Sequence, residues 1–400
     1  MKYPLVASSW GTEEIEALHR IVDSGNFTMG EEVRAFEKEF AQKFGAKHAV
    51  MVNSGSNANF TAIASLIYKD KNPLRRPEII DGKVIYEGDE VIVPAISWST
   101  TYTPFEIFGI KLRVVDVDLC TLNIDIAKLE AALTPQTKAV VAVNILGNPC
   151  NLFGLRKFCN RHGLYLIEDN CESMGASISG KYCGTFGDVG TFSTFFSHHI
   201  STMEGGMILT DDEELCHRMR AFRAHGWDRD LPANSPIACR PENWRYEMYN
   251  FTNIGLNHRP TELNGAVGRI QLRKLDGFVE QRRKNAEVFT DLFDGDERFI
   301  TQREFGKSSW FDFSVILRPE LAISRDKIWD GLKAAGIEHR PITGGSFVRH
   351  PAERWYRYEC AGELPNANLA HDNGFFIGNF GHDIRKEIEY FHKKLVRLVS

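Results

Sequence analysis

Short apolar runs that alternate with amphipathic stretches set the strongest limit on how this chain can fold. Each run is bounded by turn-forming residues and is followed by a stretch with helical periodicity. Runs of this kind are buried on both faces, which is typical of parallel strands joined by helices. We therefore predict an α/β fold with a mainly parallel sheet flanked by helices. The clearest runs are Glu90–Pro94, Lys111–Asp116, Lys138–Asn144 and Leu164–Asp169.

The pattern changes after about residue 275. A long charged helix is expected over Arg273–Phe293, followed by a strand-like run, Phe311–Leu317, and more helices. This change predicts a large domain over residues 1–275 and a smaller C-terminal α+β domain over residues 276–400. A polar stretch with prolines and glycines at about residues 69–88 is expected to be a surface insertion in the large domain.

Composition argues against several classes of function. The 48 basic and 53 acidic residues leave a net charge of −5, so nothing favours nucleic acid or an anionic membrane as a partner. No signal peptide or bilayer-spanning stretch is evident, and we expect a cytoplasmic protein. The eight cysteines form no close pairs, so no metal site is expected. The basic cluster Arg282-Arg283-Lys284 is interpreted as solvated helix surface, with a diphosphate clamp as the alternative.

Polar residues follow the predicted strands, where ligands of open parallel sheets bind. Asp169 ends one run, and a carboxylate buried there needs a hydrogen-bonding or cationic partner, unless it caps the next turn. Trp98 could stack on a ring or pack in the core. The polar turn Asn53–Asn59 leads into an apolar helix, whose free N–H groups could bind a phosphate, although such turns also cap helices that bind nothing.

Two adjacent histidines, His198 and His199, follow the run that contains Ser193. Their neighbours Thr202 and Glu204 make the segment look too polar for a packed core. A third metal ligand is missing at the usual spacing, so catalysis is favoured over metal binding. Imidazole can act as an acid or a base near neutral pH.

These segments resemble the sugar aminotransferases and dehydratases of the aspartate aminotransferase fold (type I), over nearly the whole chain. In that family, a lysine five residues after the phosphate-binding serine bonds to pyridoxal 5′-phosphate. Here His198 occupies the lysine position and Glu204-Gly205-Gly206 closes the loop. Imidazole cannot form the imine that lysine forms, so the expected reaction changes. The resemblance is carried by Phe27–Gly30, Val52–Ser56, Pro94–Thr101, Leu146–Asn148, Glu168–Gly175, Ser197–Gly206 and Ala224–Trp227.

The resemblance implies a cofactor site built from five residues. Gly55, Ser56 and Ser193 would bind the cofactor phosphate. Trp98 would stack on the cofactor ring, and Asp169 would pair with the ring nitrogen and keep it protonated.

Three further residues take implied roles from the same resemblance. Glu172 stands where the aminotransferases usually have a glutamine near the phenolic oxygen of the cofactor. Asn257 matches an asparagine that reaches the phosphate of the other subunit's cofactor, which implies a homodimer with shared active sites. His225 matches an active-site histidine and is placed with the substrate-binding residues.

The reaction implied by the resemblance is a dehydration. L-Glutamate would convert pyridoxal 5′-phosphate to pyridoxamine 5′-phosphate. With His198 as acid and base, a nucleotide-linked 4-keto-6-deoxy sugar would then lose its C3 hydroxyl and give a 4-keto-3,6-dideoxy sugar. The nearest resemblance implies GDP as the nucleotide and leaves CDP and dTDP open. Trp310 and residues 340–347 are the expected contacts of the base.

Three other functions fit parts of the pattern. A dehydrase that depends on an iron–sulfur centre and a reductase has a similar pair of histidines, although its close cysteine spacing is missing here. A sugar aminotransferase would need another proton carrier in place of the lysine. A non-catalytic sugar-nucleotide sensor could keep the fold without the lysine.

Overall fold

The computed structural model describes residues 1–69, 83–239, 243, 245, 248–321 and 323–400. An eight-stranded sheet dominates it, and all neighbouring strands run parallel except those that flank β9, which is antiparallel to both of its neighbours. The strands follow one another across the sheet as β1 (His48–Val52), β9 (Gly206–Thr210), β8 (Val189–Ser193), β5 (Tyr165–Asp169), β4 (Thr137–Val143), β2 (Glu90–Pro94), β3 (Lys111–Val115) and β12 (Tyr358–Cys360).

The predicted α/β architecture is confirmed. The four apolar runs become β2, β3, β4 and β5, with bounds that differ by at most one residue at each end. The helices of this part of the fold are α1 (Thr12–Ser24) and α2 (Glu31–Phe44), which precede the first strand, and α3 (Gly55–Tyr68), α4 (Ser99–Ile107), α5 (Leu129–Ala132), α6 (Leu152–His162) and α7 (Glu213–Arg223).

Helices cover both faces of the sheet because successive strand residues point to opposite sides. In β2, Val91 and Val93 belong to the apolar core beneath α3, α4 and α7, while Ile92 belongs to the core beneath α5 and α6. Strands buried on both faces cannot show a polar alternation, which explains why they read as continuous apolar runs.

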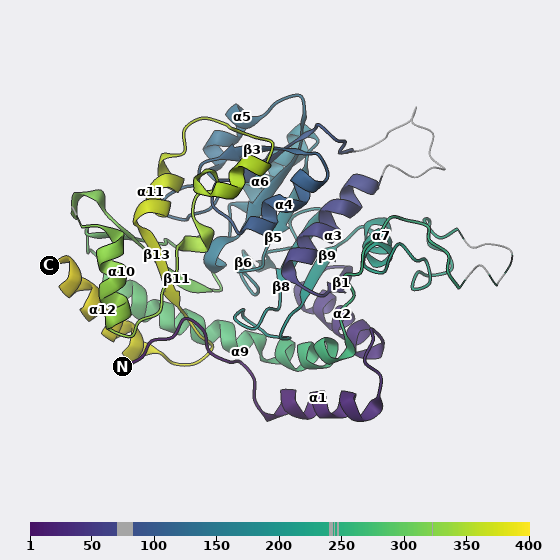
Figure 1. The fold of residues 1–400 in the computed structure, drawn as a ribbon, viewed down its shortest axis with the longest axis horizontal. Helices are drawn as coiled ribbons and strands as arrows, with labels where there is room; N and C mark the ends of the chain where they lie inside the picture. Colours follow the sequence, from purple (N-terminus) through teal and green to yellow (C-terminus); the bar gives the residue numbers. More distant parts are fainter. Residues whose placement is uncertain (70–82, 240–242, 244, 246–247, 322) are drawn as a thin grey trace.

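A single long helix connects the two parts of the fold. This helix, α9 (Glu262–Phe293), packs against α1 and α2 in its first half and reaches the C-terminal unit in its second half (Figure 1). The expected helix over Arg273–Phe293 therefore begins eleven residues earlier, at a capping box formed by Thr261 and Asn264. The expected domain boundary near residue 275 falls inside α9 and stays a prediction.

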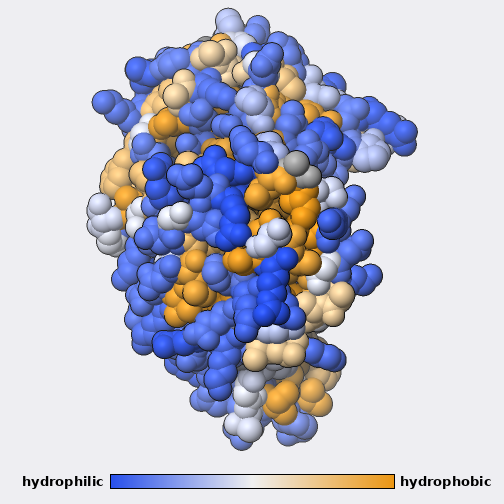
Figure 2. All heavy atoms as spheres, turned by 90° about the vertical axis from the view of Figure 1, so that its left-hand side faces the viewer, coloured by the Kyte–Doolittle hydropathy of each residue, from blue (hydrophilic) through white to orange (hydrophobic). Residues whose placement is uncertain are grey.

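The C-terminal unit contains a separate three-stranded antiparallel sheet, ordered β10, β11, β13. Its core also includes Tyr3 from the N-terminus, whose hydroxyl donates to the Gly378 carbonyl at 2.6 Å. In Figure 2 the side of the molecule that carries this unit faces the viewer, and its surface is mostly hydrophilic, with apolar residues visible between the polar ones. The elements are β10 (Phe299–Thr301), β11 (Asp312–Leu317), β13 (Gly374–Gly378), α10 (Arg325–Ala334), α11 (Pro365–Asn373) and α12 (Arg385–Val399).

Two further features bear on the sequence predictions. Most of the insertion expected at about residues 69–88 lies outside the described residues. None of the helices in the described part of the chain has both the length and the apolar character needed to cross a membrane.

Candidate active site

The expected site residues of the large domain gather at one edge of the sheet. Asp169 ends β5 and Ser193 ends β8, while Gly55 and Trp98 lie at the starts of α3 and α4. In a parallel sheet this carboxyl edge is where ligands bind.

The turn before α3 lies in direct contact with the ends of two strands. A Cβ atom on Gly55 would stand 2.6 Å from Cβ of Ser193 and 3.0 Å from Sγ of Cys171, closer than real Cβ contacts allow. A Cβ on Gly206 would overlap the Ser54 carbonyl oxygen. The Ser54 hydroxyl caps α3 by accepting from the Asn57 N–H at 3.1 Å. The result is a narrow cradle at the positive end of a 14-residue helix, which suits a phosphate group.

Asp169 is buried, and both of its carboxylate oxygens accept hydrogen bonds. One carboxylate oxygen accepts from Asn59 Nδ2 and from Thr101 Oγ1, both at 2.8 Å, and the other accepts from the Cys171 N–H at 3.1 Å. The last bond means that Asp169 also caps the turn after β5. The two interpretations offered from the sequence therefore do not compete, because one carboxylate can cap the turn and still face a protonated ring nitrogen.

Trp98 does not pack in the core. It is 60% exposed at the N-terminal end of α4, so its ring face is available to a ligand. Next to it in α4, the Thr100 hydroxyl bonds to the Ser56 hydroxyl at 2.8 Å. This bond connects the starts of α3 and α4.

His198 is held in a defined tautomer. Its Nδ1 lies 2.6 Å from the Cys171 carbonyl oxygen. A carbonyl only accepts, so Nδ1 carries the hydrogen and Nε2 keeps the lone pair of a base. The pKa of His198 is lowered to about 4, chiefly by burial and also by the Arg282 charge, while the hydrogen bond to Cys171 and the Asp169 charge act in the opposite direction. His198 is therefore neutral at physiological pH.

The segment after His198 corrects one expectation. His199 is 1% exposed and Thr202 is fully buried, so the segment is packed in the interior although its sequence is polar. The Thr202 hydroxyl is satisfied, because its Oγ1 bonds to Thr194 Oγ1 at 2.6 Å and donates to the Glu204 carbonyl at 2.9 Å. The buried Nδ1 of His199 has no hydrogen-bond partner among the residues that the structure describes. His199 Nε2 donates to the Ser309 carbonyl at 3.2 Å, which is a structural contact.

Glu172 joins the two parts of the fold. Its carboxylate accepts from the Leu146 N–H at 2.8 Å and from Thr343 Oγ1 at 3.3 Å. The pKa of Glu172 is raised to about 7, chiefly by burial and also by the nearby Asp169 charge, while the hydrogen bonds from Leu146 and Thr343 lower it. At neutral pH, this carboxyl therefore carries a proton for a large share of the time.

His225 and Asn257 lie on two segments that pair with each other. The backbones of Ala224 and Asn257 form a β-bridge, and the His225 N–H donates to the Leu256 carbonyl at 2.9 Å. Asn257 is exposed, and its side chain accepts from Arg259 Nε at 3.0 Å. The Asn53 N–H donates to the His258 carbonyl at 3.0 Å, so this segment borders the turn before α3.

Three residues of this cluster were missed from the sequence. Asn59 and Thr101 hold Asp169, and the Cys171 backbone orients His198. Asn59 follows Gly55 by one helical turn, so helical periodicity could have placed it on the same face. The roles of Thr101 and Cys171 depend on contacts between separate elements, which the sequence does not display.

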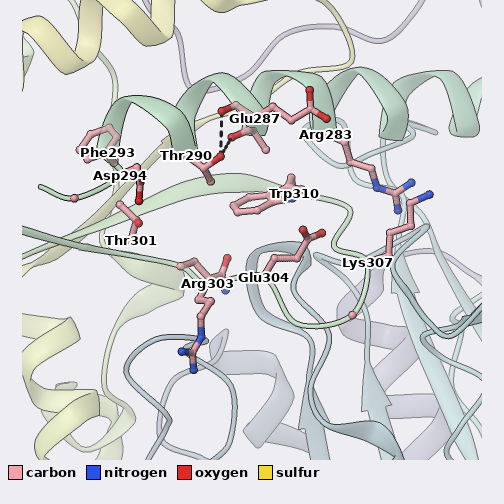
Figure 3. A pocket seen from close by; sticks show the side chains of 14 residues that line it. Arg283, Glu287, Thr290, Phe293, Asp294, Thr301, Arg303, Glu304, Lys307 and Trp310 are labelled. Atoms are coloured by element: carbon pink, nitrogen blue, oxygen red, sulfur yellow. Dashed lines mark hydrogen bonds between the residues drawn. The ribbon is translucent and has the colours of Figure 1, made fainter.

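One other expectation needs correction. Arg282 is not on a solvated surface but is 5% exposed. Trp310 is also 5% exposed, and it lines a cavity of about 530 Å³ between α9 and residues 301–310 (Figure 3). The expected contact of Trp310 with the nucleotide base stays a prediction. Arg283, Glu304 and Lys307 line the same cavity.

Comparisons with known proteins agree with this geometry. The profile of the DegT/DnrJ/EryC1/StrS aminotransferase family matches residues 8–388. The chain belongs to this family. The GDP-4-keto-6-deoxy-D-mannose 3-dehydratase of Yersinia pseudotuberculosis is 46% identical over 391 residues, which are 97% of each chain.

Solved structures extend the family assignment. A crystal structure of GDP-4-keto-6-deoxymannose-3-dehydratase with a trapped PLP–glutamate geminal diamine is 44% identical, with a TM-score of 0.93 over 98% of this chain and 100% of that chain. A histidine-to-asparagine variant of such an enzyme, with bound GDP-perosamine, matches with the same TM-score and coverage. The predicted resemblance and the aspartate aminotransferase fold are thus confirmed.

The raised pKa of Glu172 predicts a pH-dependent effect of Glu172→Gln on stability. The folded-state pKa of about 7 lies above the ordinary 4.5, so wild-type stability falls as the pH rises through this window, because folding then requires burial of a charge or uptake of a proton. Glutamine lacks this cost. Relative to wild type, the variant should gain about 2–3 kcal/mol in the free energy of unfolding from about pH 5 to about pH 8, as measured by urea denaturation. A difference that does not change with pH would contradict the shift.

Proposed function

We propose that this chain is a pyridoxal 5′-phosphate-dependent 3-dehydratase that acts on GDP-4-keto-6-deoxymannose. The observation that carries the proposal is the state of His198. It stands at the position of the family's lysine, donates from Nδ1 to a backbone carbonyl and leaves Nε2 unprotonated. A neutral imidazole can accept a proton but cannot bond to an aldehyde, so the site suits acid–base chemistry.

The residues present fit the cofactor. The cradle at Gly55 leaves no space for a side chain and offers helix N–H groups to a phosphate, with the hydroxyls of Ser56 and Ser193 beside it. Asp169 would hold the protonated ring nitrogen, and the exposed Trp98 would cover a ring face. When bound in its amine form, the cofactor supplies an electron sink next to the C4 carbon of the sugar.

The chain's own groups then have separate tasks. Asn59 and Thr101 donate hydrogen bonds to Asp169, so its carboxylate is held in one orientation. His198 Nε2 would take a proton from the C4′ carbon of the cofactor and give it to the departing C3 hydroxyl, which one residue can do when both positions lie within its reach. Glu172 would meet the phenolic oxygen of the cofactor. L-Glutamate would restore the amine form.

A homodimer with shared active sites accompanies the proposal. Asn257 and His225 lie beside the turn before α3 and would serve the cofactor of the partner subunit and the substrate. Apolar side chains exposed on the surrounding segments support a protein partner: Phe27, Phe196, Met203, Tyr249, Phe251 and Leu256. We propose a cytoplasmic role in supplying a dideoxy sugar, because one relative is a lipopolysaccharide biosynthesis protein of Salmonella typhimurium at 30% identity.

The reaction can be tested by mass spectrometry of the product. The protein is incubated with pyridoxal phosphate, L-glutamate and GDP-4-keto-6-deoxymannose, without a reductase. We expect a product that has lost one oxygen atom and kept its ketone. A stable amino sugar would instead indicate an aminotransferase. Binding without turnover would indicate a sensor, and turnover only with a reductase would indicate the iron–sulfur mechanism.

His198→Asn should abolish dehydration without abolishing cofactor binding. Asparagine keeps a polar side chain of similar size but cannot exchange a proton, so turnover should fall by about 10²–10⁴-fold. Cofactor binding is measured by absorbance titration and turnover by product formation. His198→Lys is the matched control, because its amine should form a borohydride-reducible bond with pyridoxal phosphate. Wild-type turnover in His198→Asn would refute the assignment.

Gly55→Ala should weaken cofactor binding, because the added methyl group would collide with Ser193. We expect a loss of at least about tenfold in affinity for pyridoxal phosphate, measured by fluorescence titration. The control is Gly277→Ala on α9, where a Cβ meets nothing within 4 Å. That variant should bind the cofactor normally and gain about 0.5–1 kcal/mol in stability. Equal affinity in both variants would remove Gly55 from the phosphate site.

A further inference from the structure

Arg282 is a buried cation on α9 that makes no salt bridge within the described part of the chain. It is 5% exposed, and its Nη1 donates to the carbonyl oxygens of Phe311 and Asn379, both at 2.6 Å. Burial lowers its pKa to about 10, so it is still charged at neutral pH. These carbonyl oxygens accept from Nη1 only, and the buried Nε has no hydrogen-bond partner in the part of the chain that the structure describes. The nearby acid is Asp312, which raises the pKa of Arg282, but burial raises the pKa of Asp312 itself and favours its uncharged form. The Arg282 charge is therefore not neutralised by an ion pair among the described residues. A positive charge therefore acts on its surroundings from inside the protein.

Phe311 connects this cation to the catalytic histidine. The Arg282 guanidinium lies 6.0 Å from the centre of the Phe311 ring, and the His198 ring lies 5.0 Å from the same ring at an angle of 42°. Both backbone polar groups of Phe311 are hydrogen-bonded, because its N–H donates to the Leu146 carbonyl at 3.0 Å and its carbonyl accepts from Arg282. His198 therefore packs on a surface that Arg282 anchors.

We propose that Arg282 is a positioning residue for His198: it fixes Phe311 behind the imidazole ring, and its charge adds to burial in favouring the neutral form of that ring. The inference rests on the proposed acid–base role of His198. A neutral imidazole is the form that can accept a proton, so a nearby cation favours the active state of the base. The intervening space is filled by an aromatic side chain, where charges interact more strongly than across water.

The other charged and polar groups around His198 favour the opposite state. Asp169 on β5 and the Cys171 carbonyl both stabilise the protonated ring, whereas burial and Arg282 disfavour it. Arg283, the next residue on α9, acts on His199 but not on His198. It donates to the Ser308 and Gly175 carbonyls at 2.8 and 3.2 Å and lines the cavity beside Trp310 (Figure 3). Arg283 therefore provides a matched control on the same helix.

The experiment follows the His198 imidazole by NMR in protein with ¹⁵N-labelled histidine, with its signal assigned from the His198→Asn variant. Arg282→Gln removes the charge and keeps a donor for the carbonyls, and Arg282→Lys keeps the charge. We expect the protonated fraction of His198 at acidic pH to rise at least about threefold in Arg282→Gln, because loss of the cation raises the pKa. Arg282→Lys and Arg283→Met should titrate as wild type.

Several outcomes would overturn the proposal. A folded Arg282→Gln protein with a wild-type titration would remove the electrostatic effect, and an equal shift in Arg282→Lys would show that charge is not its cause. Should Arg282→Gln not fold, Arg282→Met replaces it. The wild-type protein alone also provides a test, because a His198 pKa at or above the ordinary value of 6.5 would contradict the proposal.

The pH dependence of kcat/KM separates this inference from the proposed function. We expect the acid limb of the wild-type profile to move to higher pH in Arg282→Gln, with Arg283→Met unchanged, since activity is lost when the base becomes protonated. Absence of any dehydration in wild type would refute the proposed function and leave the NMR result intact. Turnover in wild type with an unmoved acid limb in Arg282→Gln would refute only the role of Arg282.

Discussion

The close contact between the turn before α3 and the ends of β8 and β9 organises the active site. Gly206 lets the β9 backbone approach the Ser54 carbonyl, and Gly55 lets the turn approach Ser193. Because β8 continues into the His198 segment, the same contact sets the distance between the proposed phosphate cradle and His198, the proposed base. Strands β5 and β8 are neighbours, so Asp169 is brought to the same edge. One backbone contact thus sets the relative positions of the cradle, Asp169 and His198.

A balance of charges then decides what this geometry can do. Asp169 places a negative charge in the interior, and Arg282 places a positive charge behind His198 without a salt bridge to neutralise it among the described residues. His198 is neutral because burial and the cation together outweigh the carboxylate. The pKa of Glu172 is shifted in the opposite direction, which favours the protonated form of its carboxyl group. Two groups whose pKa values shift in opposite directions in this way are typical of a site that assigns separate acid and base roles to its residues.

Much of this arrangement could be predicted from the sequence, and the remainder has a common physical reason. The strands were visible because burial on both faces produces continuous apolar runs, and the cradle and Asp169 were visible because they follow strands or begin helices. The burial of Arg282 and Thr202 was not visible, since their partners are backbone carbonyls and hydroxyls contributed by other segments. The clamp of Cys171 on His198 was missed because a main-chain carbonyl has no signature in the side-chain sequence.

Three of the seven non-glycine residues with positive φ in the described part of the chain lie where the two parts of the fold meet around the site. Leu146, Trp310 and Thr343 all have positive φ, at 52°, 48° and 36°, although none is a glycine. Leu146 and Thr343 both donate to Glu172, and the peptide groups of Leu146 and Phe311 are hydrogen-bonded. Each such residue costs roughly 1–3 kcal/mol, which the surrounding packing must offset. These three strained residues either aim donors at Glu172 or precede Phe311, which packs against His198. The large and small parts of the fold are therefore fixed to each other through the groups that control protons at the active site.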